Sequence, residues 1–516
     1  MRQLLSTLFI QSAENQSLFI FSEIEMKILP IFAMMEFVGI GFNEKICESG
    51  REKVQNKINY LEYKAKVLLP GKVFSLSSTE DISQLLFQDL KIPVPEIAKA
   101  NQQYNGNKGG GGCGGGVRRQ NYSTKGAVLE HISHHHPLPG LIIEIRKLTH
   151  HITHYVDILG KYEYHSDRFN MRRIYSTIQQ TVVPTGRISM AFPNLQNISH
   201  PIEFRVAPSE TDLQSQDSIK SFQDEIHTFD YTNDQNFKNL LEIESRCSFT
   251  KVSLRNSFTC ANGYVLLSAD YSQLELRILT HYSKDPNLIE MFNYSRELDV
   301  FKCIAHQLSG VDYEKVSDEE RNFAKHLVYG ILYGMGINSI ASELKVDKEK
   351  AKVQLERFKN TYRTLIDFLE SIEDRVFIDA YIKTLFGRIR NFSAIHDPKT
   401  LPKDIGKIKR GARNSVPQGT AADITKLAMI NIQSQFDQLS INVHMVLQLH
   451  DELLFEVPLT DIDQSAKIIK ESMENVVKLN VPLPIKMSIG TNWGSLESFN
   501  FNFTYSQQPK NKYPNN

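Results

Sequence analysis

The feature that most constrains the fold is an apolar strand segment with an acidic residue at its end, found at two distant places. Residues 264–269 (YVLLSA) form a short apolar run directly before Asp270, which indicates a buried strand. Residues 443–457 carry two apolar segments about a turn that contains Asp451, as in a β-hairpin. Because residues 318–334 have a helical pattern, the predicted fold class is α+β.

The pairing of Asp270 with Asp451 predicts a metal-dependent site. Two carboxylates on rigid strands can hold two Mg²⁺ ions about 3.5–4 Å apart, where they serve the attacking and leaving oxygens of phosphoryl transfer. Mg²⁺ prefers few carboxylates together with water and phosphate oxygens, which suits a site with two acids. Taken alone, each acid has an ordinary explanation, as the cap of a following helix for Asp270 and as a turn residue for Asp451.

A second candidate site lies on the predicted helix 318–334. Arg321, Lys325, Tyr329 and Tyr333 recur every four residues and therefore project from one slowly drifting face. Two cations followed by two aromatic rings suit a triphosphate followed by a sugar and a base. Considered by itself, a solvated basic face that runs into a packed aromatic end explains the pattern equally well.

Charge averages to zero over the 516 residues, with 59 Lys and Arg against 59 Asp and Glu. A neutral chain argues against a nucleic-acid partner, but the local charges differ. Residues 146–187 hold seven basic and three acidic residues, and residues 401–426 hold six and two, so each segment carries +4. Residues 203–245 hold three basic and ten acidic residues, or −7. The net charge of zero therefore includes two basic segments and one acidic insertion whose charges nearly cancel.

Two segments predict insertions without regular structure. Within residues 101–122, the run 109–116 holds seven glycines around Cys113, and the Val-Arg-Arg that follows does not fit a phosphate loop. Residues 200–248 are acidic and rich in Ser, Gln and Asn, which predicts a solvated loop. No run of about 18 uncharged apolar residues is present, so no membrane partner is expected.

Neither cysteine nor histidine spacing favours a zinc site. The five cysteines are scattered without a C-x-x-C pair, which fits a reducing compartment. Histidines crowd one region, and His150 and His154 have the spacing of a zinc helix, but no Glu sits at 151 and no third acid ligand is placed as a catalytic zinc site requires. These histidines are His134, His135, His136, His150, His151 and His154.

Longer motifs around the candidate residues resemble motifs A, B and C of the family A DNA polymerases. They read DYSQLELR at 270–277, RNFAKHLVYGILYG at 321–334 and QLHDELLFEV at 448–457. Further matches are TGRISMAFPNLQNI at 185–198, TLFGR at 384–388, RNSVPQGTAADI at 413–424 and IGTNWG at 489–494. Within the family, the segments at 24–42, 77–87 and 136–147 resemble the polymerase domain of the eukaryotic theta type most, with the nu type second.

The resemblance implies a right-hand fold with palm, fingers and thumb. The implied parts are a remnant of an upstream exonuclease-like region at 1–22, palm entry and thumb at 23–165 with the Gly-rich insertion 101–122, a first palm part at 166–286 with the acidic insertion 200–248, fingers at 287–399, a second palm part at 400–504, and a disordered tail at 505–516. The polyglycine run is not expected of the family. The acidic insertion would repel phosphates unless it lies away from the duplex.

The resemblance also implies a role for each site residue. Two Mg²⁺ ions would be bound by Asp270, Asp451 and the carbonyl of Tyr271, with Glu452 as a supporting acid. Lys325 would bind the triphosphate and protonate pyrophosphate, and Glu275 would exclude a ribose 2′-OH. Other residues that would contact the incoming dNTP are Arg321, Tyr329, Tyr333, Gln273 and His450. Those that would contact primer-template DNA are Arg187, Asn194, Asn197, Arg413, Asn414, Gln418, Gln448 and Lys302.

The expected function is template-directed DNA synthesis from dNTPs, without proofreading because only about 22 residues precede the matching region. Repair by end joining or lesion bypass in the nucleus is expected, with a mitochondrial form as the alternative because the N-terminus is apolar. Competing hypotheses are an inactive DNA-binding pseudo-polymerase, a nu-like repair polymerase and a nucleotidyltransferase that needs no template. A binding module needs no metal carboxylates, so Asp270 and Asp451 favour an enzyme.

Overall fold

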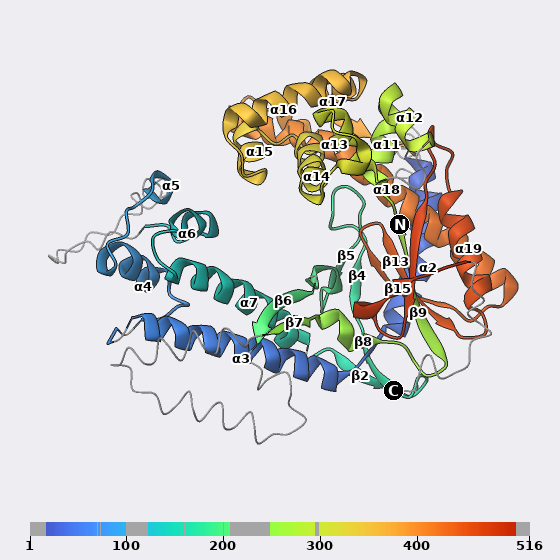
Figure 1. Ribbon diagram of the computed structural model, residues 1–516. Helices are drawn as coiled ribbons and strands as arrows, with labels where there is room; N and C mark the ends of the chain where they lie inside the picture. The colour runs from blue at the N-terminus through green and yellow to red at the C-terminus, as the bar shows by residue number, and fades with distance from the viewer. Residues whose placement is uncertain are drawn as a thin grey trace. The chain divides into compact units, whose positions relative to one another are not determined.

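The computed structural model describes residues 17–69, 71–72, 74–99, 122–158, 161–199, 201–206, 248–294 and 299–501 (Figure 1). The chain divides into two compact units. The larger unit comprises Met1–Phe42, Tyr162–Asn197 and Thr259–Asn516, and the smaller comprises Asn43–Lys161 and Ile198–Phe258. Nearly all of the predicted Gly-rich insertion, most of the acidic insertion and the predicted tail lie outside the described residues.

A five-stranded antiparallel sheet forms the centre of the larger unit, in the order β12-β13-β9-β14-β15. Its strands are β12 (His444–Leu449), β13 (Glu452–Pro458), β9 (Tyr264–Tyr271), β14 (Ile485–Gly490) and β15 (Glu497–Ser498). The helices α19 (Ile462–Glu474) and α2 (Met26–Val38) pack against it. Figure 1 shows α2 beside strands that are far away in sequence.

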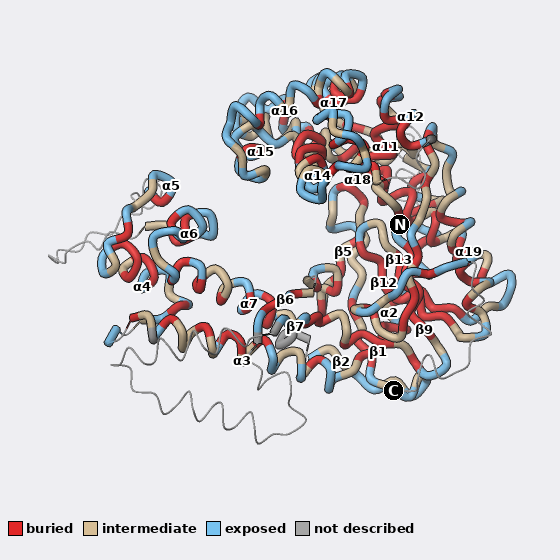
Figure 2. The backbone as a smooth tube through the Cα atoms, viewed as in Figure 1, coloured by how far each residue is buried: buried red, intermediate tan, exposed pale blue. Residues whose placement is uncertain are grey.

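The sequence predicted the central strands because they are buried almost throughout, as Figure 2 shows in red. In β9, Val265, Leu266 and Leu267 are all fully buried, which accounts for a continuous apolar run rather than an alternating one. The predicted hairpin at 443–457 is confirmed as β12 and β13. Asp270 lies within β9 rather than after its end, because β13 and β14 both pair with β9 up to that residue.

Smaller strand pairs flank the central sheet in the larger unit. The strands β2 (Glu163–Ser166) and β1 (Ile40–Phe42) pair with β3 (Met171–Ile174), and β4 (Thr177–Gln179) pairs with β5 (Ser189–Ala191). The short strand β8 (Phe258–Thr259) lies at the chain boundary between the two units. Arg173 on β3 and Glu456 on β13 form a fully buried ion pair, which connects the sheet that contains β1, β2 and β3 to the central sheet.

Helices and one short hairpin make up most of the remaining larger unit. The helices α13, α14, α16 and α17 share one apolar core, in which Ile304, Leu327, Phe358 and Leu365 are buried. The helix α14 begins at Asp318 because Ser317 and Glu320 form a capping box, which confirms the predicted start. The helices of this part are η1 (Ile20–Glu25), α11 (Leu274–Ser283), α12 (Pro286–Tyr294), α13 (Val300–Ser309), α14 (Asp318–Leu332), α15 (Ile337–Glu343), α16 (Lys348–Thr361), α17 (Arg363–Asp379) and α18 (Pro402–Leu439). The short hairpin consists of β10 (Tyr381–Lys383) and β11 (Ile389–Asn391). Short 3₁₀ turns lie at Leu195–Asn197, Tyr313–Lys315, Ser393–His396 and Trp493–Ser495.

The smaller unit is mainly helical. Its helices are α3 (Glu44–Leu68), α4 (Thr79–Gln84), η2 (Leu85–Asp89), α5 (Glu96–Lys99), α6 (Gly126–Ile132) and α7 (Leu138–Ile158). The helices α3 and α7 lie side by side. The strands β6 (Ile202–Val206) and β7 (Ser248–Val252) pair antiparallel and are followed by the 3₁₀ turn Leu254–Ser257.

Two details of this unit differ from the sequence analysis. The prediction of a loop from residue 200 is wrong at its start, because residues 202–206 form β6, with Ile202 and Phe204 buried and Glu203 and Arg205 exposed. That alternation is typical of a strand, but the acidic composition concealed it. The whole segment Ile198–Phe258 groups with the smaller unit, whereas the implied division placed it in the first palm part. The complete six-part division stays a prediction.

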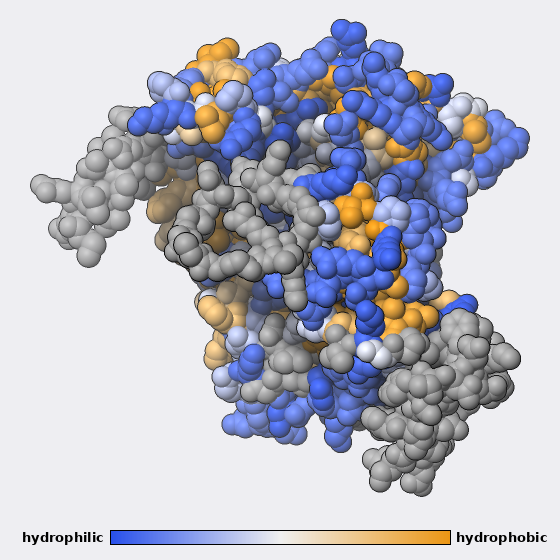
Figure 3. Space-filling model, turned by 90° about the vertical axis from the view of Figure 1, so that its left-hand side faces the viewer, coloured by the Kyte–Doolittle hydropathy of each residue, from blue (hydrophilic) through white to orange (hydrophobic). Residues whose placement is uncertain are grey.

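Among the described residues, no helix is both long and apolar enough to cross a membrane. The face drawn in Figure 3 is mostly hydrophilic, and its hydrophobic residues gather in separate patches.

Candidate active site

The central sheet brings together the two predicted metal carboxylates. Asp270 is the penultimate residue of β9, and Asp451 lies in the turn between β12 and β13. The backbone N–H of Tyr271 donates to the Asp451 carbonyl at 3.3 Å, and Glu452 lies directly opposite Asp270 in the strand register. Because the Asp270 side chain is exposed, a cation can reach its oxygens.

The turn that presents Asp451 has an uncommon backbone. His450 has a φ of 50°, in the left-handed region that residues other than glycine rarely adopt. Gln448 Nε2 donates to the His450 carbonyl at 2.5 Å, and Gln196 Nε2 donates to the Gln448 carbonyl at 3.1 Å. Gln273, after Asp270, also has a φ of 50°. Such conformations occur where the surrounding structure imposes them, often at functional sites.

Both carboxylates are held in an environment that disfavours negative charge. The surrounding protein reduces the hydration of Asp270, and this effect together with the nearby charges of Glu452 and Asp451 raises its pKa to about 7. Burial likewise raises the pKa of Asp451 to about 6, against the opposing effect of Arg187. A divalent cation between the two would relieve this unfavourable charge, so the residues fit a metal site.

The described residues contain no group of three His, Cys, Asp or Glu side chains arranged for a metal ion. The hydroxyl of Ser268 donates to Glu452 Oε1 at 2.5 Å, so this third acid already has a protein partner. A magnesium ion held by Asp270 and Asp451 would complete its shell with the Tyr271 carbonyl, water and phosphate oxygens, which matches the preference of Mg²⁺ for few carboxylates.

Glu275, the predicted gate, connects the metal carboxylates to the candidate nucleotide-binding helix. It lies on α11 with 8% of its surface exposed. Its Oε1 accepts from Arg187 Nη2 at 2.5 Å, and its Oε2 accepts from the Tyr333 hydroxyl at 2.9 Å. Arg187 Nη2 also lies 3.8 Å from Asp451 Oδ1. Four residues predicted from separate motifs therefore form one contiguous network.

The helix α14 presents the predicted cation–aromatic face. Lys325 is exposed, and the rings of Tyr329 and Tyr333 stack with their centres 5.8 Å apart. Burial, together with the nearby carboxylates, raises the pKa of Tyr329 to about 12, so its hydroxyl is neutral at physiological pH. Arg321 at the other end of the face is paired with Asp299, a residue that the sequence did not single out.

The residues predicted to contact DNA differ in their environments. Three of them lie on α18. Arg413 pairs with Glu373 at 3.3 Å, and Gln418 is half-buried. Two atoms, Arg413 Nε and Asn414 Oδ1, are buried without a hydrogen-bond partner among the described residues. Gln448 is buried on β12, where it supports the turn described above. Asn194 Oδ1 accepts a hydrogen bond from the Gln196 N–H, and Asn197 is exposed. The Lys302 ammonium lies 4.9 Å from the centre of the Tyr313 ring.

A buried ionic network, also missed by sequence reasoning, connects α18 to the start of the chain. Glu25 accepts hydrogen bonds from Arg388 and Lys426, and Arg388 also pairs with Asp423 at 2.7 Å. Burial alone would raise the pKa of Glu25, but the two cations lower it below its usual value. Arg388 belongs to the TLFGR motif, Asp423 to the motif at 413–424 and Glu25 to the segment 24–42, but none of these patterns indicated that the three side chains meet.

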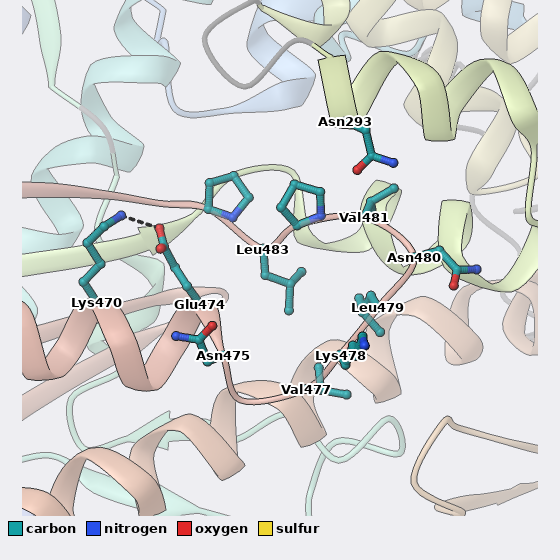
Figure 4. A pocket seen from close by; sticks show the side chains of 12 residues that line it. Asn293, Lys470, Glu474, Asn475, Val477, Lys478, Leu479, Asn480, Val481 and Leu483 are labelled. Atoms are coloured by element: carbon teal, nitrogen blue, oxygen red, sulfur yellow. Dashed lines mark hydrogen bonds and ion pairs between the residues drawn. The ribbon is translucent and has the colours of Figure 1, made fainter.

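A cavity of about 690 Å³ is lined by side chains from two helices and one connecting segment (Figure 4). It is lined by α12, α19 and residues 477–484. The last segment also supports the turn after Asp270, because the Pro484 carbonyl accepts from the Ser272 N–H at 3.0 Å and the Pro482 carbonyl accepts from Arg277 Nη1 at 2.9 Å. This cavity therefore borders the support of the candidate active site, and no predicted site residue lines it.

Comparisons with known proteins show the family to which the chain belongs. The model of DNA polymerase family A matches residues 44–495. DNA polymerase theta of Mus musculus is 32% identical over 93% of the chain, and the thermostable DNA polymerase I of Thermus aquaticus is 30% identical over 93%. A solved structure described as the POL domain of Pol1 from M. smegmatis in complex with DNA primer-template and dNTP superposes with a TM-score of 0.75 at 26% identity, covering 95% of this chain and 74% of that one.

The chain belongs to the family A DNA polymerases and has their α+β fold. Its similarity to theta supports the predicted likeness to the polymerase domain of the theta type. The chain spans about 20% of the mouse protein and about 49% of the Thermus aquaticus protein.

Proposed function

We propose that this chain is a template-directed DNA polymerase that adds dNTPs to a primer 3′-OH by two-metal phosphoryl transfer. One observation carries the proposal: Asp270 and Asp451, from distant segments, lie close together at one end of neighbouring strands in the central sheet. Through Arg187, Glu275 and Tyr333 they are connected to the cation–aromatic face of α14. Metal ligands and a nucleotide-binding surface in one network fit phosphoryl transfer from a nucleotide.

Each side chain in the network has a definite task in the proposed reaction. Asp270, Asp451 and the Tyr271 carbonyl would hold two Mg²⁺ ions, which supply charge stabilisation at the attacking and leaving oxygens. Arg321 and Lys325 bind the triphosphate, and Lys325 gives its proton to the departing pyrophosphate. Tyr329 stacks on the nucleotide, and Glu275 occupies the space that a ribose 2′-OH would need.

Primer extension with Mg²⁺ and dNTPs tests this function directly. We expect Asp451→Asn to lower kcat by at least about 10³-fold, as expected for a member of a catalytic unit. Glu497→Gln on the edge strand β15 is the matched control: it removes an exposed acid from the same sheet and should extend primers at the wild-type rate. If wild type fails to extend a matched primer, or Asp451→Asn extends equally well, the proposal is wrong and the pseudo-polymerase alternative is favoured.

We further propose a theta-type role in nuclear DNA repair, by end joining or lesion bypass, without proofreading. The identity to mouse DNA polymerase theta supports this narrower role. Wild type should extend ends that share only a few paired bases, and it should not remove a mismatched 3′ nucleotide when dNTPs are withheld. Extension of fully paired primers alone would favour a nu-like or general repair polymerase instead.

A further inference from the structure

Asp299, the residue before α13, connects this helix to the candidate triphosphate site. Its Oδ1 accepts from the backbone N–H groups of Phe301 and Lys302 at 2.9 and 3.0 Å, so it caps the helix. Its Oδ2 accepts from Arg321 Nε at 3.1 Å and from Arg321 Nη2 at 2.8 Å. One carboxylate therefore fixes both a helix N-terminus and the guanidinium predicted to bind a triphosphate.

We propose that Asp299 is a positioning residue for the incoming nucleotide, holding the Arg321 guanidinium ready for phosphate oxygens. A guanidinium has five N–H donors in a fixed plane. In Arg321, Nε and Nη2 each donate to Asp299, and Nη1 donates to Asn322 at 3.0 Å. Three donors are thus engaged, and one N–H on each terminal nitrogen remains for a phosphate. This inference rests on the proposed polymerase function.

The charge of Asp299 could instead compete with the phosphates for Arg321, so its net effect needs a physical argument. About a third of each side chain is exposed, so water screens the direct repulsion between Asp299 and a triphosphate. The helix N–H groups and the guanidinium also stabilise this charge, and they lower the pKa of Asp299 although burial would raise it. Without the carboxylate, the long Arg321 side chain would lose rotamer freedom when it binds phosphate. Preorganisation therefore dominates.

The packing around α13 supports the same conclusion. The Phe301 ring centre lies 5.7 Å from Arg321 Cζ and 5.7 Å from the ring centre of Tyr329. The first turn of α13 thus contacts the triphosphate end and the base end of the α14 face, and Asp299 caps that turn. Asp299 therefore holds both the first turn of α13 and the direction of the Arg321 guanidinium.

The test measures dNTP binding and turnover separately in the full chain. We expect Asp299→Asn to raise the KM for dNTP about tenfold, or about 1.4 kcal/mol, and to leave kcat within about twofold. The amide can still cap α13 but accepts more weakly from Arg321. Asp347→Asn is the matched control, because Asp347 caps α16 in the same way and its N-cap bond goes to Lys350 on its own helix. It should leave both constants unchanged.

A double-mutant cycle separates positioning from a structural role. If Asp299 acts through Arg321, Asp299→Asn should change KM by less than about twofold in an Arg321→Met background. Binding of inorganic tripolyphosphate, measured by calorimetry, should weaken in Asp299→Asn and follow the same cycle. This readout does not require catalysis.

Three results would overturn the inference. They are an unchanged KM in Asp299→Asn, a lower KM, which would show competition with phosphate, and full additivity with Arg321→Met. Failure of the proposed function is distinguishable, because wild type would then not extend a primer at all.

Discussion

The sheet-borne carboxylates and the α14 face belong to one site, but different forces hold them. Asp270 and Asp451 are placed by backbone pairing, through the register of β9 with β13 and the Tyr271 N–H. Arg321 on α14 and Tyr333, which directly follows α14 because the helix ends two residues before the predicted end at 334, are instead oriented by side chains of other elements, Asp299 and Glu275. The candidate metal ligands are therefore held by the backbone of the sheet, whereas the candidate nucleotide-binding face can be adjusted by residues outside its motif.

Glu275 contacts Tyr333 directly and the carboxylate pair through Arg187, so its removal should have the largest effect among changes that leave the chemistry intact. Glu275→Ala opens space beside the sugar, and we expect discrimination against ribonucleotides to fall roughly 10- to 100-fold, the range typical of small steric differences in a pocket. The measurement is the ratio of kcat/KM for dNTP and rNTP. Unchanged sugar discrimination would show that Glu275 only links Arg187 to Tyr333 and is not a gate.

The Mg²⁺ requirement, which depends on the carboxylate pair, should vary with pH more than dNTP binding, which depends on the α14 face. Because the pKa of Asp270 is raised to about 7, protons compete with Mg²⁺ below that pH. With one competing proton, the Mg²⁺ concentration for half-maximal activity should rise about tenfold from pH 8 to pH 6, while the KM for dNTP changes less. An Mg²⁺ requirement independent of pH would show that the charge of Asp270 is already compensated within the protein.

The raised pKa of Asp270 should also make the stability of the metal-free protein depend on pH. A carboxyl with a raised pKa binds more protons in the folded than in the unfolded chain between pH 3.8 and about 7. The free energy of unfolding should therefore fall as pH rises through that window, and saturating Mg²⁺ should remove the dependence. Thermal unfolding at several pH values, with and without Mg²⁺, measures it.

The two regions also differ in how far the sequence predicted them. The carboxylate pair could be predicted because buried strands and a hairpin turn leave local patterns, and the long motifs identified the family. The Asp299–Arg321 contact could not, because an Asp before a helix is fully explained as a cap and its second partner is 22 residues away. Glu25 and Lys426, 401 residues apart, leave no local pattern at all. Strand β6 was missed because its acidic surroundings outweighed a short alternation.

The smallest expected effect concerns packing behind the α14 face. Phe301→Leu removes a ring that contacts Tyr329, and we expect the KM for dNTP to rise about two- to threefold, in line with the modest energy of an aromatic pair. The control is Phe358→Leu, which removes a buried ring paired with Tyr362 in the same helical core. Both variants should unfold at lower temperature, since each leaves space in a packed core. Only Phe301→Leu should change KM; an equal change in both would mean that nucleotide binding depends on the stability of the whole helical core, and the two regions would then differ less than their contacts indicate.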